Sequence, residues 1–264
     1  MGILNVTPDS FFDGGRYLNE EAAIDHGLEL VAQGADILDI GGESTRPGSL
    51  PVEETEELRR VIPVIEGLAR QVAAPISIDT MKPAVARAAV AAGASIINDV
   101  GANRAEPEMW QIAAESGAAY VCMHMQGVPK TMQASPFYLD VVMDVARFFQ
   151  ERLLKLERCG VPASQIILDP GIGFGKTLEH NLQLLGNLWQ FARFRRPLLI
   201  GVSRKSFIGH LAGSETANRL PGGLACACLG TAAGVHVVRV HDVAETVLAL
   251  RMTEAILSKS KRAE

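Results

Sequence analysis

The sequence predicts a single-domain α/β protein with the architecture of a (β/α)₈ TIM barrel over residues 1–264. Three observations predict this fold: eight short apolar runs, amphipathic helical patterns between them, and a recurring glycine where helical patterns meet the next run. Eight units in 264 residues average 33 residues each, close to the ~30 residues of one strand–helix–strand motif. An open doubly wound sheet is the alternative, because periodicity alone does not decide whether a sheet closes.

The eight predicted strands are short and rich in β-branched residues. Such runs are typical of strands that are covered on both faces in a parallel sheet. No low-complexity linker or shift in composition separates them, which favours one domain. In chain order they are residues 2–5, 37–40, 76–79, 95–98, 120–123, 166–169, 198–201 and 237–240.

Amphipathic patterns between these runs predict helices, because each places its apolar side chains on one stripe. The stripes cover residues 20–33, 53–72, 140–158, 178–190 and 242–257. We expect Asn19 to be the N-cap of the first helix, since Asn is a favoured cap. Asp242 followed by Glu245 predicts a capping box that opens the last helix.

Glycine follows five of the helical patterns and lies shortly before a β-rich run each time. These positions are Gly34, Gly93, Gly117, Gly160 and Gly234. Many helices end on a residue in the left-handed conformation, which glycine adopts without steric cost. We therefore expect each of these glycines to close a helix and turn the chain into a strand.

Composition and charge exclude several classes of protein. With 30 acidic and 25 basic residues the net charge is −5, so there is no basic field typical of a nucleic-acid partner. No apolar run reaches the ~18 residues of a membrane helix, and the N-terminus lacks a secretory signal pattern. We therefore expect no membrane partner and a cytoplasmic location. The four cysteines have no metal or disulfide spacing, so we expect reduced thiols.

Polar side chains stand at the ends of the predicted strands, where a barrel places its active site. One such residue alone is often only a helix cap, but polar ends on so many strands would converge on one mouth. They are Asn5, Asp39, Asp79, Asn98 with Asp99, His124, Asp169, Lys205 just past the seventh run, and Arg239 with His241.

The segments after the first two strands are long and glycine-rich. Long loops at a barrel mouth commonly act as lids. The first, residues 6–15, contains Phe11 and Asp13, and the second, residues 41–48, contains Thr45, Arg46 and Pro47.

The sequence contains no complete nucleotide-binding or zinc-binding motif. Residues 169–177 end like a Walker A loop, but Pro170 occupies the position of its first glycine. The same glycines read G-x-G-x-G, which is not the dinucleotide fingerprint. The six histidines are scattered and form no H-E-x-x-H motif, so we expect no zinc site.

The charges at the predicted mouth indicate the kind of ligand. The cationic groups suit a phosphate or diphosphate; they are Arg46, Lys205, Arg239 and His241. A carboxylate accepts two parallel N–H bonds, and an Asn offers both a donor and an acceptor. Asp79, Asn98 and Asp169 therefore suit a ring with several N–H groups. The residue chemistry indicates a donor-rich heterocycle with an anionic tail.

Eight strings, in order over residues 1–243, resemble the dihydropteroate synthases of bacterial folate synthesis. They are MGILNVTPDSF, GGESTRPG, SIDT, IIND, MHMQG, LDPGIGFGK, SRKSFIG and RVHDV. The resemblance implies a (β/α)₈ barrel that forms a homodimer. It also implies an enzyme that joins 4-aminobenzoate to (7,8-dihydropterin-6-yl)methyl diphosphate, releasing pyrophosphate and 7,8-dihydropteroate.

The resemblance also implies roles for individual residues. Asp79, Asn98 and Asp169 would hold the pterin ring, with Lys205 on its carbonyl or ring-nitrogen side. Asn5 would ligate the Mg²⁺ on the diphosphate, which Arg239 and His241 would bind with Thr45 nearby. The aminobenzoate pocket would include Phe11, Thr45, Arg46, Pro47, Phe174 and Ser206. His124 would either line the floor of the pterin pocket or serve packing alone.

The expected chemistry needs no protein nucleophile, because a dihydropterin can stabilise a cationic methylene once diphosphate leaves. We expect the catalytic residues to be Asp13, Lys205, Arg239 and His241, with Asp13 stabilising the cation or ordering the closed loops. Phe12 departs from the family pattern, in which many relatives carry a small polar residue. The sequence also begins at the first strand, where relatives carry a preceding segment, so we expect a less stable barrel bottom.

Two other functions remain open at this level. A pterin-dependent methyltransferase would share the pterin-binding Asp and Asn residues, and a paralogue would bind pterin without turnover. The S-T-R-P-G, S-R-K-S and R-V-H strings favour the synthase, because a methyltransferase has no diphosphate to hold.

Overall fold

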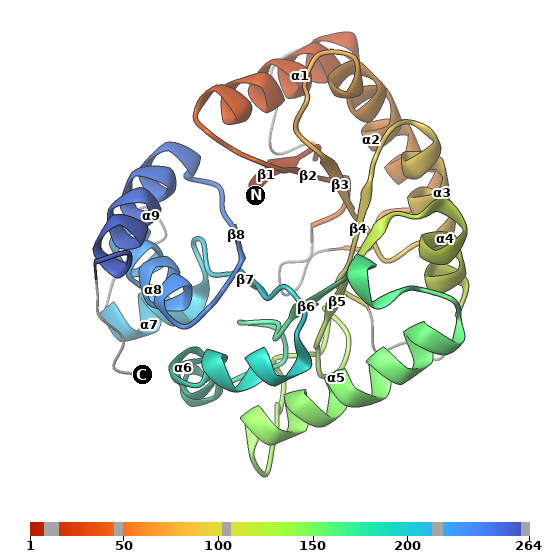
Figure 1. Ribbon diagram of the computed structural model, residues 1–264. Coiled ribbons are helices and arrows are strands. Elements are labelled where there is room, and N and C mark those ends of the chain that lie inside the picture. Colours follow the sequence, from red (N-terminus) through yellow and green to blue (C-terminus); the bar gives the residue numbers. More distant parts are fainter. Residues whose placement is uncertain (8–15, 45–49, 102–106, 213–218, 260–264) are drawn as a thin grey trace.

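The computed structural model describes residues 1–264 except 8–15, 45–49, 102–106, 213–218 and 260–264. Within this part of the chain, strands alternate with helices that surround them (Figure 1). The strands are Gly2–Asn5 (β1), Leu38–Gly41 (β2), Ile76–Asp79 (β3), Ile96–Asp99 (β4), Ala119–Met123 (β5), Ile166–Asp169 (β6), Leu199–Gly201 (β7) and Val237–Arg239 (β8). Each lies within one residue of its predicted bounds.

The sheet closes into a barrel, which decides between the two predicted architectures. β1 to β6 pair in parallel in chain order, and β7 pairs in parallel with β8. Two parallel bridges join these parts, Leu168 with Leu198 and Gly2 with Val240. At the second seam the Ile3 amide donates to the Val240 carbonyl at 2.9 Å. The (β/α)₈ prediction is therefore confirmed, and the open sheet is wrong.

Helices cover the outside of the barrel (Figure 1). The α-helices are Arg16–Ala32 (α1), Glu54–Ala69 (α2), Pro83–Ala91 (α3), Glu108–Ser116 (α4), Val141–Arg158 (α5), Leu178–Gly186 (α6), Ser206–Ala212 (α7), Leu220–Ala232 (α8) and Val243–Leu257 (α9). The described residues also include two short 3₁₀ segments, Ala163–Gln165 (η2) and Leu188–Phe194 (η3). In the described part of the chain, no helix is long and apolar enough to cross a membrane.

Three local predictions about these helices are wrong. Asn19 lies inside α1, which begins at Arg16, because the residues just upstream are themselves compatible with a helix. The predicted helix 178–190 ends at Gly186, where two poor helix formers in succession give way to a 3₁₀ turn. Asp242 stands at the N-cap of α9 but makes no capping bond, since its carboxylate is bonded to Arg204.

The five predicted glycine joints are confirmed. All five adopt the left-handed backbone, with φ of 101°, 121°, 73°, 85° and 93° at Gly34, Gly93, Gly117, Gly160 and Gly234. At Gly93 a Cβ would lie 2.8 Å from the Ala69 methyl. That joint therefore needs glycine for both its conformation and its space.

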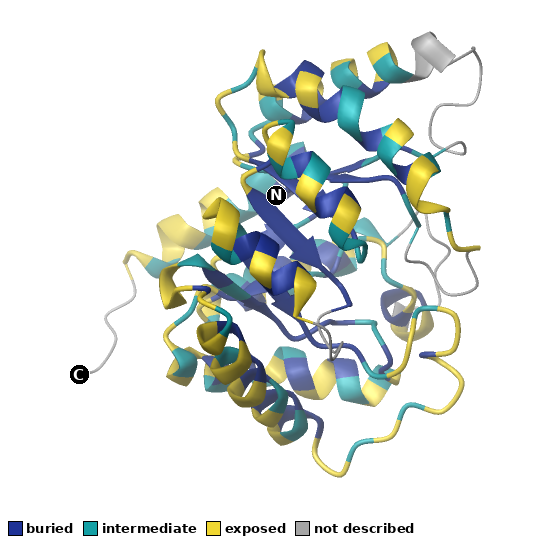
Figure 2. Ribbon diagram, turned by 90° about the vertical axis from the view of Figure 1, so that its right-hand side faces the viewer, coloured by how far each residue is buried: buried dark blue, intermediate teal, exposed yellow. Residues whose placement is uncertain are grey.

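Alternation along the strands separates two apolar layers. Outward residues such as Leu38, Ile97 and Leu168 pack against the helices in the main core. Inward residues at the amino ends of the strands, including Ile96, Val121 and Leu199, form a separate plug inside the barrel. The strands are buried, whereas the helices expose one face to solvent (Figure 2). The next inward residue on each strand, two positions on, faces the mouth.

Candidate active site at the barrel mouth

Polar residues occupy the inward position above the apolar plug on several strands. Asn98 follows Ile96 by two residues, and Asp169 follows Ile167 in the same way. Arg239 likewise follows Val237 at the end of β8. Strand register places Asn5 opposite Gly41, Gly41 opposite Asp79, and Asp79 opposite Asn98. The inward-facing members of the predicted set therefore come together at one end of the barrel. Asp99 does not, because it faces the surrounding helices, where its Oδ2 accepts from the Tyr120 hydroxyl at 2.7 Å.

A fully buried carboxylate, Asp39, organises the centre of this cluster. Its Oδ2 accepts hydrogen bonds from Asn98 Nδ2 at 3.1 Å and from Arg239 Nε at 2.5 Å. The other side of the same guanidinium, Nη2, donates to Asp79 Oδ2 at 2.6 Å. Arg239 thus bridges β8 to β2 and β3 and holds two carboxylates with a single charge.

Burial and ion pairing shift the pKa values of the groups in this cluster. Burial raises the pKa of Asp79, and Arg239 opposes that rise. Burial lowers the pKa of Arg239, but Asp39 and Asp79 outweigh it, so the guanidinium stays charged. The Oδ1 atoms of Asp39 and Asp79 are buried without a hydrogen-bond partner. Buried acceptors are costly when unpaired, so Asp79 Oδ1 at the mouth is ready to accept an N–H from a ligand.

Asp169 and Lys205 form a second part of the site. Asp169 Oδ1 accepts from the Gly171 amide at 2.7 Å, and burial raises the pKa of this carboxyl to about 6. Burial and the charge of Arg239 lower the pKa of Lys205 to about 8. The Lys205 ammonium lies 4.1 Å from the centre of the Phe174 ring, close enough for a cation–π contact. The Lys205 ammonium therefore lies over one face of the Phe174 ring.

Hydrogen bonds of Lys176 stabilise the loop that carries Phe174. This buried lysine donates to the Phe174 carbonyl at 3.0 Å and lies 3.0 Å from His124 Nδ1. Burial lowers the pKa of Lys176 to about 7, and burial together with Lys176 lowers the pKa of His124. A Cβ on Gly171 would lie 1.9 Å from the His124 carbonyl. His124 therefore supports the loop through Lys176 and the backbone.

His241 is oriented by a neighbouring strand end. Its Nδ1 lies 3.0 Å from Ser203 Oγ, and its backbone amide donates to the same oxygen at 3.2 Å. Asn5 ends β1 and is half-buried. Ser206 is exposed and begins α7, next to Lys205. Phe11, Asp13, Thr45, Arg46 and Pro47 lie outside the described residues.

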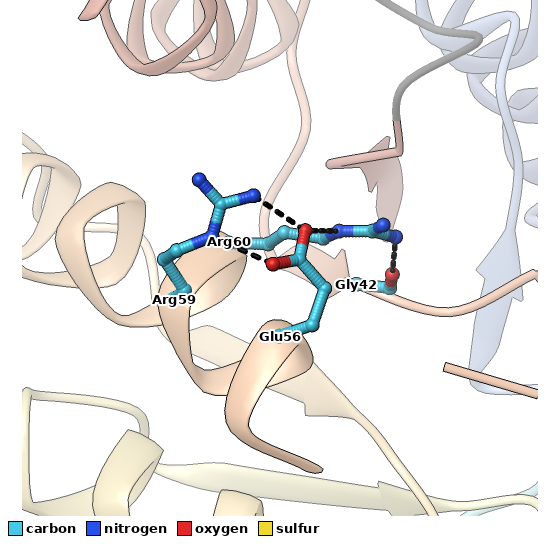
Figure 3. Close-up of polar contacts among 4 residues, drawn as sticks. All are labelled: Gly42, Glu56, Arg59 and Arg60. Carbon is cyan, nitrogen blue, oxygen red and sulfur yellow. Dashed lines mark hydrogen bonds and ion pairs between the residues drawn. The ribbon is translucent and has the colours of Figure 1, made fainter. Parts of the chain in front are cut away.

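The root of the second long loop is held by ion pairs. Arg60 Nη1 donates to the Gly42 carbonyl at 2.8 Å, while Glu56 accepts from Arg60 and Arg59 (Figure 3). Hydrogen bonds from those two guanidinium groups lower the pKa of Glu56 to about 2. One residue on, Glu43 and the buried Glu57 of α2 both pair with Lys82. The backbone is thus fixed where the loop leaves β2.

Sequence reasoning missed the parts that Asp39, Lys176 and Ser203 play in the site. Asp39 was visible as a strand-end carboxylate, but nothing local shows that it pairs with two predicted site residues. Lys176 stands seven residues after Asp169 in the failed Walker motif, where a buried lysine is not expected. Ser203 is the first residue of the S-R-K-S string, but nothing in the string shows that its hydroxyl contacts His241.

Known proteins resemble this chain over nearly all of its length. The family described as pterin binding enzyme matches residues 1–241. Dihydropteroate synthase of Escherichia coli K12 is 50% identical, over 100% of this chain and 94% of the relative, and that of Bacillus subtilis is 44% identical over 98% and 88%. The Xanthomonas albilineans enzyme solved with 4-aminobenzoic acid has a TM-score of 0.91 and 48% identity, over 98% of this chain and 93% of that one. The Yersinia pestis enzyme in a sulfonamide drug complex has a TM-score of 0.91 and 47% identity, over 97% and 93%.

Proposed function

The chain belongs to the dihydropteroate synthases of the pterin-binding enzyme family, and from this premise we propose how its barrel mouth performs their reaction. The enzyme is a transferase that condenses (7,8-dihydropterin-6-yl)methyl diphosphate with 4-aminobenzoate, giving 7,8-dihydropteroate and pyrophosphate. One observation carries the assignment of roles: Asp79, Asn98 and Asp169 lie on inward positions around the central Arg239.

The pterin ring is held by acceptors that its N–H groups satisfy. Asp79 and Asp169 are nearly fully buried and offer carboxylate oxygens at strand ends. A charged hydrogen bond contributes about 1.5–3 kcal/mol when both partners are otherwise unpaired. Asn98 adds a carbonyl acceptor while its amide is held by Asp39. Lys205, whose ammonium lies over the Phe174 ring, donates to the carbonyl or ring-nitrogen side.

The diphosphate is bound by Arg239 and His241. The fixed guanidinium supplies charge-assisted hydrogen bonds, and Ser203 orients the imidazole. Asn5 fits the role of a Mg²⁺ ligand, because its amide oxygen is a hard donor at the strand end in line with Asp79. No group of three His, Cys, Asp or Glu residues is arranged for a metal in the described part of the chain. When bound, Mg²⁺ would supply charge neutralisation to the phosphates.

The condensation exchanges one bond at the methylene carbon. The bond from this carbon to the diphosphate oxygen breaks, and the electron pair leaves with pyrophosphate. The amine nitrogen of 4-aminobenzoate forms a bond to the same carbon and loses a proton. Arg239 and His241 stabilise charge on the leaving oxygen. By resemblance to the family, we assign Asp13 to stabilising the developing cation or ordering the closed loops, and Phe11, Thr45, Arg46, Pro47, Phe174 and Ser206 to binding aminobenzoate.

Pyrophosphate release tests the function directly. The enzyme is incubated with the dihydropterin diphosphate and Mg²⁺, with and without 4-aminobenzoate. We expect release that the amine stimulates, with dihydropteroate formed in equal amount. Tight pterin binding without release would overturn the proposal in favour of a non-catalytic pterin-binding protein. Full activity in a chelator with no added divalent ion would reject the metal assignment alone.

The pH dependence of kcat/KM follows from the shifted pKa values of three groups in the site. Asp169 ionises near pH 6, burial raises the pKa of Asp79 as well, and Lys205 loses its proton near pH 8. The form with both carboxylates ionised and the ammonium charged predominates only between these acid and alkaline ionisations, so we expect a bell-shaped profile whose acid limb reports Asp79 and Asp169 together. Lys205→Arg should move the alkaline limb upward, because guanidinium stays charged. Ionisation of the substrate is common to both enzymes, so an unchanged alkaline limb in the variant would contradict the role of Lys205.

The enzyme is proposed to be a homodimer that uses the outer face of α8 and α9. Leu248, Met252 and Ile256 lie four residues apart on α9 and are 68%, 64% and 62% exposed, and Leu229 of α8 is 70% exposed. Side chains at this spacing share one helix face, and the two helices pack against each other. Such an apolar face favours an interface.

Sedimentation velocity tests this dimer. We expect Leu248→Asp to shift the protein from dimer to monomer, because an interface does not tolerate an unpaired buried charge. The matched control is Leu154→Asp on α5, which is also exposed and lies away from α8 and α9. A wild-type monomer, or equal effects of both substitutions, would reject this interface.

A cytoplasmic location is proposed as well. All four cysteines are free, which agrees with the reducing environment of that compartment.

A further inference from the structure

The segments that follow β7 and β8 are joined by two adjacent contacts. Ser203 binds His241, as described above. One residue further along each segment, the Arg204 guanidinium binds the Asp242 carboxylate with two bonds, Nη2 to Oδ1 at 2.5 Å and Nε to Oδ2 at 3.2 Å. Lys205 and His241 are the direct chain neighbours of this ion pair. The pair thus connects the two segments that carry site residues.

The backbone at Arg204 is strained. Its φ is 58°, in the left-handed region that non-glycine residues rarely adopt. Positions of this kind persist only where the surroundings fix them, and they concentrate at functional sites. Here the Arg204 side chain is held by Asp242, and its carbonyl accepts from Arg219 Nη1 at 3.2 Å. The turn directs the next residue, Lys205, to Phe174 and the mouth.

The Asp242 carboxylate binds Arg204 and does not cap α9. It stands at the N-cap of α9 with no side-chain capping bond, although capping is the usual role of an Asp there. A single-contact surface ion pair would contribute little. This pair is bidentate, anchors a strained turn and replaces a cap, which indicates a positioning role.

We propose that Arg204 and Asp242 are positioning residues that fix Lys205 and His241 relative to one another. This deepens the proposed function and rests on it. Lys205 contacts the pterin and His241 the diphosphate, so their separation must match the single substrate that carries both groups. We call this Arg204–Asp242 ion pair the brace. Without it, Lys205 and His241 would still be present but no longer correctly spaced for the substrate, and small misalignments have large effects on rate.

Arg204→Gly distinguishes an effect of the ion pair on activity from an effect on the stability of the fold. Glycine relieves the strained φ but removes the ion pair. We expect kcat/KM for the dihydropterin diphosphate to fall about 10- to 100-fold, while the unfolding midpoint stays level or rises. Asp242→Asn should give a similar loss. Because the two residues act as one unit, the double variant should lose no more than either single variant.

Pyrophosphate affinity, measured by calorimetry, tests the brace without turnover. We expect about 10-fold weaker binding in Arg204→Gly than in wild type. The matched control is Arg87→Gln, which removes an exposed ion pair with Glu115 on α3 and α4 and should change neither quantity. Wild-type kcat/KM and pyrophosphate affinity in Arg204→Gly, or additive losses in the double variant, would overturn the brace. Absence of dihydropteroate formation by the wild type would instead overturn the proposed function, with the affinity measurement still deciding on the brace.

Discussion

Arg239→Met is expected to slow turnover roughly 10²- to 10³-fold and to destabilise the fold at the same time. Arg239 is the cation bound to Asp39 and Asp79 at the centre of the mouth. Removing one partner of a buried ion pair leaves an uncompensated charge, which costs about 3–5 kcal/mol of unfolding free energy. The leaving diphosphate also loses a charged donor, worth about 3–4 kcal/mol, or roughly 10²- to 10³-fold in rate. Chemical denaturation at pH 8 and a steady-state assay measure the two effects.

The sign of the pH effect distinguishes this cause from simple loss of packing. Burial raises the pKa of Asp79 in the folded protein, and losing Arg239 removes the group that opposes the rise. Protonation at low pH then neutralises the Asp79 carboxyl that has lost its Arg239 partner, so the variant should recover part of its stability at pH 5. Adding Asp79→Asn to Arg239→Met should also restore part of the stability at pH 8, but no activity. A variant as stable as wild type at pH 8 would contradict the central role of the guanidinium.

Asp169→Asn is expected to lower activity and to raise the stability of the fold at pH 8. The neutral amide keeps an acceptor for the Gly171 amide but loses the carboxylate that accepts two N–H groups of the pterin. Each charged hydrogen bond lost costs about 1.5–3 kcal/mol, so losing two should lower kcat/KM roughly 10²- to 10⁴-fold. Calorimetric pterin affinity should fall in parallel, because the lost contact is to the ring.

The stability gain follows from the pKa of about 6 in the folded protein. An Asp ordinarily ionises near 4, so between pH 4 and 6 the folded state binds more protons than the unfolded state. Stability from this group is full below that window and is lost as pH rises through 6, by up to about 3 kcal/mol. Asn removes this dependence, so the variant should be more stable than wild type at pH 8 and not at pH 4. Equal stability of both proteins at pH 8 would reject the buried ionised carboxylate.

The strands and their joints were predictable because their signals are local. Gly34 and Gly93 mark helix ends through a backbone requirement of one residue, and apolar runs such as 76–79 identify buried strands within four residues. Helix caps were less predictable, since a cap competes with other partners of the same side chain. Asp242 has the sequence context of a cap but binds Arg204, 38 residues away in the chain.

The sequence by itself determined that Asn98, Asp169 and Arg239 stand at strand ends, and the motif strings identify the family. It did not decide which strand-end side chains face the mouth, because the neighbouring Asp99 is directed outward to Tyr120. Only the tertiary structure decided which of these groups are paired. Arg239 meets Asp39 across 200 residues of chain because the barrel closes between β8 and β1. The ionisation of the site depends on those pairings and on burial, and neither is encoded in a local pattern.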